Sequence, residues 1–205
     1  MSGIIAQNTL DNSGLIKSPA GGGAWNFIKK LTADGSSGTL SFVDGASDVD
    51  LSTYKEYIFT FNNIHPATDN ASFHFNLSID TGSNYNVAKT SSSFRQQHAE
   101  DDASTELAYD AALGLAQGTG GQKLADSGND SDQALSGYIH LFDPSSTTFI
   151  KHYIATSNGS RWNDLQQQYF ISGYANTTSA VDAVRFQMSP GNMDAGDICL
   201  YGISS

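Results

Sequence analysis

Acidic side chains are the most numerous groups in this chain that could take part in catalysis. Hydrolysis of a glycosidic bond needs two carboxylates that face each other across the bond. Four carboxylates lie close together in the sequence, Glu100, Asp101, Asp102 and Glu106, but their polar surroundings indicate a solvated surface loop. The chain has 21 acidic residues, nearly all of them aspartates spread over polar segments, so a pair formed by the fold remains open.

Nucleophilic catalysis needs a serine or cysteine activated by a base. The chain contains neither a G-x-S-x-G elbow nor a P-loop pattern, and we interpret the serines of residues 35–38 as part of a turn. The single cysteine, Cys199, rules out an intrachain disulfide and lies in a short apolar run. We expect a small buried thiol there rather than a reactive one. We therefore predict no catalytic residue and no enzymatic activity.

Two groups of residues could ligate a metal. The segment from Asp126 to Asp132 collects the oxygen ligands that Ca²⁺ prefers, but it lacks the order and the distal glutamate of an EF-hand, so a cation there stays open. No H-x-x-x-H or H-x-H pattern occurs among the five histidines, His65, His74, His98, His140 and His152. His140 and His152 could be cross-strand neighbours, for which surface-facing partners or rings at a subunit interface are favoured over a zinc site. We predict no cofactor.

A carbohydrate site on a β domain would combine an exposed aromatic side chain with nearby amide and carboxylate groups. The best candidate is Trp162 with Asn163 and Asp164, in the polar segment 157–164. A loop tryptophan can equally pack down onto the edge of the domain. If the segment binds a glycan, Trp162→Ala should abolish the affinity without loss of folding.

The composition limits the classes of partner. A formal net charge of −11 argues against nucleic acid and against an anionic membrane surface, because both are themselves negatively charged. The first residues have no basic region followed by a long apolar core, so we expect no signal peptide. No run approaches the ~20 apolar residues of a membrane helix.

The elements that would position these groups are strands. Glutamate, lysine and arginine are scarce whereas Gly, Ser, Thr, Asn and Asp are abundant, which favours strands joined by turns. Between residues 54 and 80 an aromatic and β-branched run is followed by a connection containing Pro66 and then by strict alternation. Phe73, Phe75, Leu77 and Ile79 fall on one face. We interpret this stretch as an antiparallel pair with one buried face.

Strand patterns recur along the rest of the chain. They are clear at residues 24–28, 38–43, 168–174, 184–188 and 197–203, weaker at 85–87 and 92–95, and residues 137–142 and 148–154 predict a hairpin. Residues 99–134 are the least regular, and 107–115 could form one short helix or a strand and a loop. About nine to eleven strands without a repeated βα unit predict an all-β fold, an antiparallel two-sheet sandwich of jelly-roll type.

The first 24 residues differ from the rest and predict a separate segment before a β-sandwich domain at 25–205. Short apolar pairs alternate there with polar residues, and three glycines at 21–23 form a joint. The segment is either a strap lying on the domain or a short extended arm that docks on another subunit. The side chains that would anchor such an arm, each contributing up to ~1.5–3 kcal/mol if fully buried, are Ile4, Ile5, Leu10, Leu15 and Ile16.

Several long runs resemble virion structural proteins of tailed bacteriophages that infect marine bacteria. The runs are GLIKSPAGGGAW (14–25), YKEYIFTFNNIHPATD (54–69), SGYIHLFDPSSTTFIKH (136–152), GYANTTSAVDAVRFQMSPGNMDAG (173–196) and ICLYGI (198–203). The resemblance covers nearly the whole chain and is weakest over residues 99–134. It implies a particle-surface protein, fibre-like or decorating, whose jelly-roll modules commonly form trimers. It assigns no site residue.

These observations favour a non-enzymatic virion surface protein, attached to the capsid or tail through its N-terminal arm and presenting a jelly-roll domain outward. A homotrimer in contact with other virion proteins is expected. The alternatives are a receptor-binding tail-fibre module that recognises a host-surface glycan and a depolymerase that cuts one. A reducing-end assay on host polysaccharide separates binding from cleavage.

Overall fold

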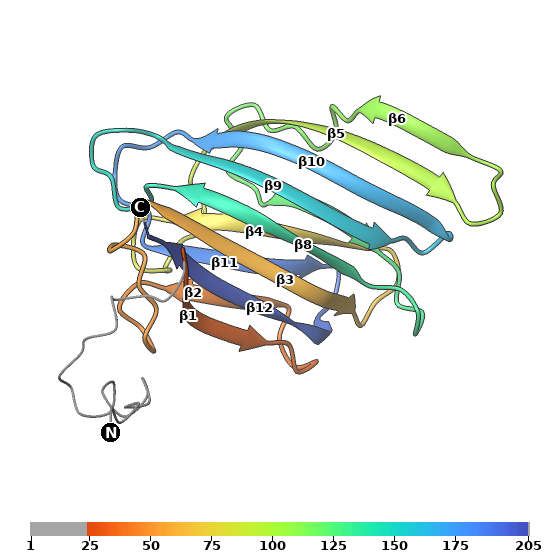
Figure 1. The fold of residues 1–205 in the computed structure, drawn as a ribbon, viewed down its shortest axis with the longest axis horizontal. Helices are drawn as coiled ribbons and strands as arrows, with labels where there is room; N and C mark the ends of the chain where they lie inside the picture. The colour runs from red at the N-terminus through yellow and green to blue at the C-terminus, as the bar shows by residue number, and fades with distance from the viewer. Residues whose placement is uncertain (1–23, 205) are drawn as a thin grey trace, which may run out of the picture.

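The computed structural model describes residues 24–204, which form two antiparallel β-sheets packed face to face as a sandwich. The larger sheet has eight strands in the order β1-β12-β3-β8-β9-β10-β5-β6, and the smaller has four in the order β2-β11-β4-β7 (Figure 1). The strands are β1 (Trp25–Thr32), β2 (Thr39–Val43), β3 (Glu56–Pro66), β4 (Ala71–Ser78), β5 (Lys89–Ala99), β6 (Thr105–Tyr109), β7 (Gln122–Ser127), β8 (Leu135–Phe142), β9 (Lys151–Ser160), β10 (Leu165–Ala175), β11 (Ala183–Ser189) and β12 (Met193–Ile203).

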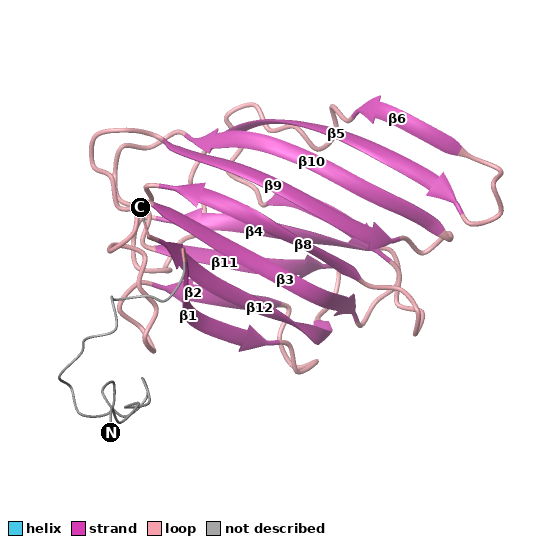
Figure 2. Cartoon of the chain, in the orientation of Figure 1, coloured by secondary structure: helices cyan, strands magenta, loops and turns pink. Residues whose placement is uncertain are grey.

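The prediction of an all-β sandwich is confirmed. Figure 2 shows strands and loops and no helix in the described part of the chain, so no helix there is long and apolar enough to cross a membrane. The predicted hairpin at residues 137–154 is also confirmed, because β8 and β9 pair antiparallel with His140 opposite Ile154. The weak strand pattern at residues 85–87 was misleading, since these residues belong to a loop.

The prediction that residues 54–80 form one antiparallel pair is wrong. Both strands exist, but β3 pairs with β12 and β8 in the larger sheet, whereas β4 pairs with β11 and β7 in the smaller one. The connection after Pro66 therefore carries the chain across the sandwich. The two buried faces meet in the core, where the ring centroids of Phe61 and Phe73 are 5.2 Å apart. Ile79 lies beyond the end of β4 and is exposed.

Aromatic side chains from both sheets fill the core. Phe59 of β3 meets Phe42 of β2 at 5.3 Å between ring centroids, and Phe75 of β4 meets Tyr153 of β9 at 5.0 Å, each close to an edge-to-face arrangement. Such pairs add about 0.5–1.5 kcal/mol to the stabilisation from burial alone. Cys199, expected in the core, is only half-buried, because alternation along β12 turns Ile198 and Leu200 inward instead.

Residues 99–134 contain two strands and a long loop rather than a helix, so the strand-and-loop alternative was correct. β6 pairs with the far end of β5, and β7 pairs with β4 in the opposite sheet. The loop between them follows the edge of β5, where the amide of Ser91 donates to the carbonyl of Leu115 (2.9 Å) and that of Asp110 to the carbonyl of Ser93 (2.8 Å). The loop therefore continues, toward the start of β5, the edge pairing that β6 makes with the rest of that strand.

Candidate functional site

The outer face of the larger sheet carries a shallow groove across β9, β10 and β5. Alternation decides which side chains reach it: β9 buries Lys151, Tyr153 and Ala155, and turns His152 and Ile154 outward. Register then aligns the outward residues of neighbouring strands in rows. The row that forms the bottom of the groove is Ile154, Ser172 and Ser92, which lie directly opposite one another.

The groove exists because two of these three side chains are small. Ser172 of β10 and Ser92 of β5 leave a hollow of about 600 Å³ on one side of their row and one of about 240 Å³ on the other, and both hollows share Ile154. The two serine hydroxyl oxygens are 3.5 Å apart, so they interact weakly with each other. The larger of the two volumes falls in the range of ligand sites.

One wall of the groove is a stacked aromatic pair. Phe94 and Phe170 lie opposite each other on β5 and β10, with ring centroids 4.7 Å apart and an angle of 12° between the ring planes. Phe94 is 46% exposed although it lies in the middle of a strand. Tyr109 of edge strand β6 continues the row beside Phe94 and is also exposed. The pair is therefore a preformed apolar platform that faces solvent.

The other wall consists of Tyr174, His152 and Phe142, one row beyond the serines. The rings of His152 and Tyr174 are 6.3 Å apart in an edge-to-face arrangement. Phe142 lies near His140, whose Nδ1 is 2.5 Å from Oε1 of Glu56. This contact fixes the orientation of the His140 ring at the groove's outer margin.

A ladder of amide side chains adjoins the Phe94 wall. Gln96 donates from Nε2 to Oε1 of Gln168 (2.7 Å), and Gln166 donates from Nε2 to Oδ1 of Asn158 (2.5 Å). In register, Asn158, Gln168 and Gln96 form the next row after the aromatic pair. Gln96 and Gln166 also line a neighbouring hollow of about 450 Å³. The ladder thus presents oriented amide groups beside an aromatic surface.

The groove is uncharged apart from one histidine. Within the described residues, its lining contains no carboxylate, lysine or arginine, and His152 is its one basic side chain. This is unusual on a chain with a net charge of −11. The hydrogen-bonding capacity of the groove therefore comes from hydroxyl groups and His152, with the amide groups of the ladder beside it.

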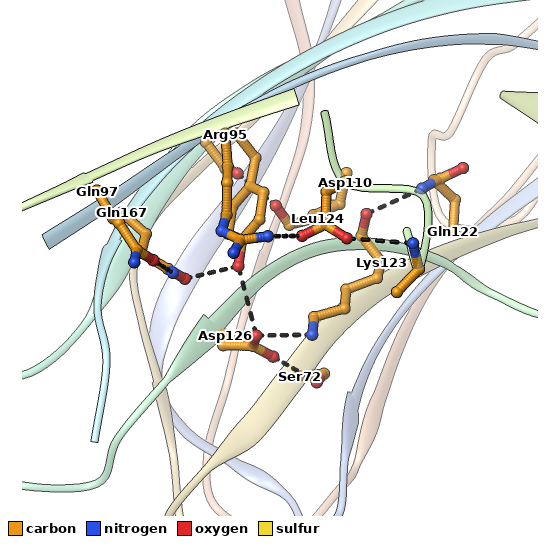
Figure 3. A network of polar contacts seen from close by, with 12 residues as sticks. Ser72, Arg95, Gln97, Asp110, Gln122, Lys123, Leu124, Asp126 and Gln167 are labelled. Atoms are coloured by element: carbon orange, nitrogen blue, oxygen red, sulfur yellow. Dashed lines mark hydrogen bonds and ion pairs between the residues drawn. The ribbon is translucent and has the colours of Figure 1, made fainter. Parts of the chain in front are cut away.

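Beneath the groove, the interior between β5, β10 and β7 holds a polar network (Figure 3). Arg95 binds Asp110 and also Glu106, the latter at 2.8 Å. Asp126 accepts from Lys123 Nζ (2.6 Å), from Ser72 (2.6 Å) and from the Tyr169 hydroxyl at 3.4 Å. These contacts tie β7 to β4 and β10, and tie β5 to β6 and to the loop that follows it.

The network is arranged for structure rather than for acid–base chemistry. Burial raises the pKa of Tyr169 well above its usual range, with the nearby Asp126 adding to the effect. Burial opposes the charge of Arg95, but its hydrogen bonds and ion pairs with Asp110 and Glu106 raise its pKa overall. A general acid for glycoside cleavage needs an environment that favours a neutral carboxyl. Asp110 and Asp126 each have a cationic partner instead.

The predicted carbohydrate residues occupy the turn between β9 and β10. Trp162 is 43% exposed, and the guanidinium of Arg161 lies 6.0 Å from its ring centroid. The backbone of Trp162 packs against Gly128, where an added Cβ would meet its Cα at 2.6 Å. Asn163 and Asp164 line a separate hollow of about 380 Å³ beside the loop at Glu100. The three residues therefore lie past the amide ladder and outside the lining of the groove.

The other candidate residues are dispersed. Asp126 faces the interior, while Asp130 accepts through its backbone carbonyl from His65 Nε2 at 3.2 Å. No three histidine, cysteine or acidic side chains of the described chain are grouped so that they could hold a metal ion. His140 is opposite Ile154 rather than His152, so the two histidines share a face but are not paired.

Of the acidic cluster at residues 100–106, the first three members lie in the exposed connection between β5 and β6, and Glu106 lies in β6. Asp102 approaches His98 at 3.2 Å, whereas Glu106 turns back to Arg95. The predicted anchors Ile4, Ile5, Leu10, Leu15 and Ile16 lie outside the described residues.

The sequence reasoning missed the groove. One signal was present: Tyr169 and Phe170 are adjacent on β10, so alternation must turn one of the two rings outward. Comparison with models of protein families, with curated proteins and with solved structures found no match to this chain.

Proposed function

We propose that this protein is a non-enzymatic structural protein of a bacteriophage virion, attached to the capsid or tail through residues 1–24 and presenting its sandwich outward as a jelly roll. Fold alone does not determine function. The proposal therefore combines the strand connectivity with the resemblance of five long sequence runs to virion structural proteins.

The connectivity is the observation that carries the proposal. Eight strands behave as one long antiparallel hairpin wrapped over two sheets, because β1 pairs with β12, β2 with β11, β3 with β8 and β4 with β7. Wrapping then brings β12 beside β3 and β11 beside β4. This pattern supports a jelly roll, a fold common in viral capsid domains. The remaining strands, β5, β6, β9 and β10, extend the larger sheet at one side.

An exposed aromatic cluster supports attachment at the N-terminal side of the domain. Trp25 and Phe27 of edge strand β1 are 53% and 61% exposed, and each packs on Tyr201 with ring centroids 5.5 and 5.7 Å apart. The cluster begins at the residue after Ala24, where the proposed arm ends. An anchoring contact made by the arm would extend onto these rings, which are of the type enriched at protein interfaces.

The test is incorporation into particles. Deleting residues 2–20 should leave a folded domain that no longer joins virions, and Trp25→Ser with Phe27→Ser should weaken incorporation of the full chain. The matched control is Phe149→Ser, which replaces an aromatic residue that is at least as exposed, on the loop between β8 and β9. Normal incorporation of the truncated chain would refute anchoring by the arm.

Two further measurements define the role on the particle. Light scattering of the purified chain tests the expected homotrimer. The copy number per virion, together with an image of the labelled protein, distinguishes a decoration protein, present in many copies, from a fibre, present in few.

A further inference from the structure

We propose that the groove across β9, β10 and β5 binds a neutral oligosaccharide. This inference rests on the lining of the groove and does not depend on a virion role. It differs from the candidate at Trp162, which lies outside that lining.

The first argument is the combination of surfaces. A sugar ring has apolar C–H faces and a rim of hydroxyl groups, so it is matched by an aromatic face next to hydrogen-bonding side chains. The stacked pair Phe94 and Phe170 provides an apolar platform on one side of the serine row, and Tyr174 provides a second aromatic ring on the other. Tyr174 is four positions after Phe170 along β10, which corresponds to about 13 Å in a strand.

The second argument is the nature of the hydrogen-bonding groups. Ser92 and Ser172 form the bottom of the groove, Thr90 and Thr156 lie beside them, and the amide ladder begins one row past Phe170. Hydroxyl and amide groups each donate and accept, as sugar hydroxyls do. The amides of Gln96 and Gln168 are already oriented by their mutual hydrogen bond, which lowers the entropic cost of binding.

The same groups disfavour the other occupants. An apolar peptide would bury the serine and threonine hydroxyls without partners, at a cost of about 1–3 kcal/mol for each group left unsatisfied. A cationic ligand would find no carboxylate in the lining of the groove among the described residues. An anionic ligand would be repelled by a chain of net charge −11. A neutral polyhydroxylated ligand satisfies all three conditions.

The experiment uses the full chain and an immobilised panel of neutral oligosaccharides of glucose, galactose, mannose and N-acetylglucosamine, with uronate-containing and sulfated oligosaccharides for comparison. We expect binding to at least one neutral member. Phe94→Ala and Phe170→Ala should each weaken that binding about tenfold or more, and Ser172→Trp, which fills the bottom of the groove, should abolish it.

Phe149→Ala is the matched control, because Phe149 is 69% exposed but does not line the groove. It should bind as the wild type does. Urea unfolding of each variant verifies that binding is not lost through unfolding, since all the substituted side chains face outward.

Four results would overturn the proposal. These are no binding to any neutral member of the panel, a preference for the charged oligosaccharides, unchanged binding by Phe94→Ala and Phe170→Ala, or loss of binding in Trp162→Ala but not in the groove variants. Light scattering adds a fifth: if Ser172→Trp dissociates an oligomer, the groove is a contact between copies of the chain and not a glycan site. None of these results bears on attachment through residues 1–24, so a failure of the glycan-binding proposal can be distinguished from a failure of the proposed virion function.

Discussion

Lys89 is the first residue of β5, and its ammonium group is buried without a carboxylate partner. Its side chain has no solvent exposure, and Nζ donates to Oδ1 of Asn76 (2.6 Å) and to the carbonyl oxygen of Val87 (2.8 Å). Burial lowers the pKa of Lys89 from 10.5 to about 8. Because Asn76 belongs to β4, this contact joins the smaller sheet to a strand that forms the groove.

The lowered pKa makes stability depend on pH in a defined direction. Between about pH 8 and 10.5 the unfolded chain binds a proton at Lys89 that the folded chain has released. The free energy of unfolding therefore rises with pH across this interval, and the full destabilisation remains below about pH 8. With these two pKa values, the contribution of Lys89 to the free energy of unfolding should increase by about 2 kcal/mol from about pH 7.5 to about pH 9.5.

The assay is urea unfolding of the wild type and of Lys89→Met at several pH values in this range. Other titrating groups are common to both proteins, so the difference in free energy of unfolding isolates Lys89. We expect Lys89→Met to lose about 2 kcal/mol relative to the wild type as the pH rises through the interval. Lys55→Met is the control, because the side chain of Lys55 is largely exposed. A difference between Lys89→Met and the wild type that stays constant with pH would refute the reasoning.

Three further predictions concern the same domain. Burial lowers the pKa of His74 to about 4, so the free energy of unfolding should fall by about 2 kcal/mol as the pH drops from about 6.5 to 4. His74→Phe should lack this dependence on pH when unfolding is followed in urea. An unchanged pH dependence in the variant would contradict the assignment to His74. Gly196 has a φ of +112°, and an added Cβ would lie 2.7 Å from the backbone of β3, so Gly196→Ala should lower the free energy of unfolding by more than 2 kcal/mol. Gly45→Ala, with φ +76° and open space around the Cβ, should lower it by about 1 kcal/mol. Equal melting temperatures of the two variants would argue against crowding at Gly196. Arg95→Met removes the cation from the mostly buried Asp110 and should destabilise by about 3 kcal/mol in urea; a loss below about 1 kcal/mol would mean that the pair is effectively solvated.

Alternation predicted most of the strands because it depends on local sequence alone. In β4, Phe73, Phe75 and Leu77 are all buried, as their spacing required. Alternation identifies a buried face but not the strand that lies alongside. The segments around Phe61 and Phe73 were therefore assigned to one pair, although their rings meet across the core from different sheets. Strands adjacent in the sequence are adjacent in the sheet for β8 and β9, but not for β3 and β4.

The groove was beyond sequence reasoning for a different reason. Its lining comes from four strands, β8, β9, β10 and β5, and which residues share a row depends on the register between them. The Phe94–Phe170 stack joins positions far apart in the chain. Nothing in the sequence distinguishes Ser92 from its neighbouring serines, and only the structure places it beside Ser172. The Trp162 segment could be identified from the sequence because its aromatic and polar residues are contiguous. Recognising it does not require knowledge of the register between strands.

The strands outside the wrapped hairpin explain why the groove and the polar interior occur together. β9, β10, β5 and β6 are consecutive at one side of the larger sheet, and the smaller sheet ends at β7. The loop after β6 therefore pairs along the edge of β5, and the inner side of β5 carries the ion pair of Arg95 with Asp110. The outer side of β9, β10 and β5 carries the groove. Because Phe94 and Phe170 are not members of the core cluster, their substitution removes a binding surface and leaves the packing between the sheets intact. The glycan experiment depends on this separation between the wrapped core and the strands added to it.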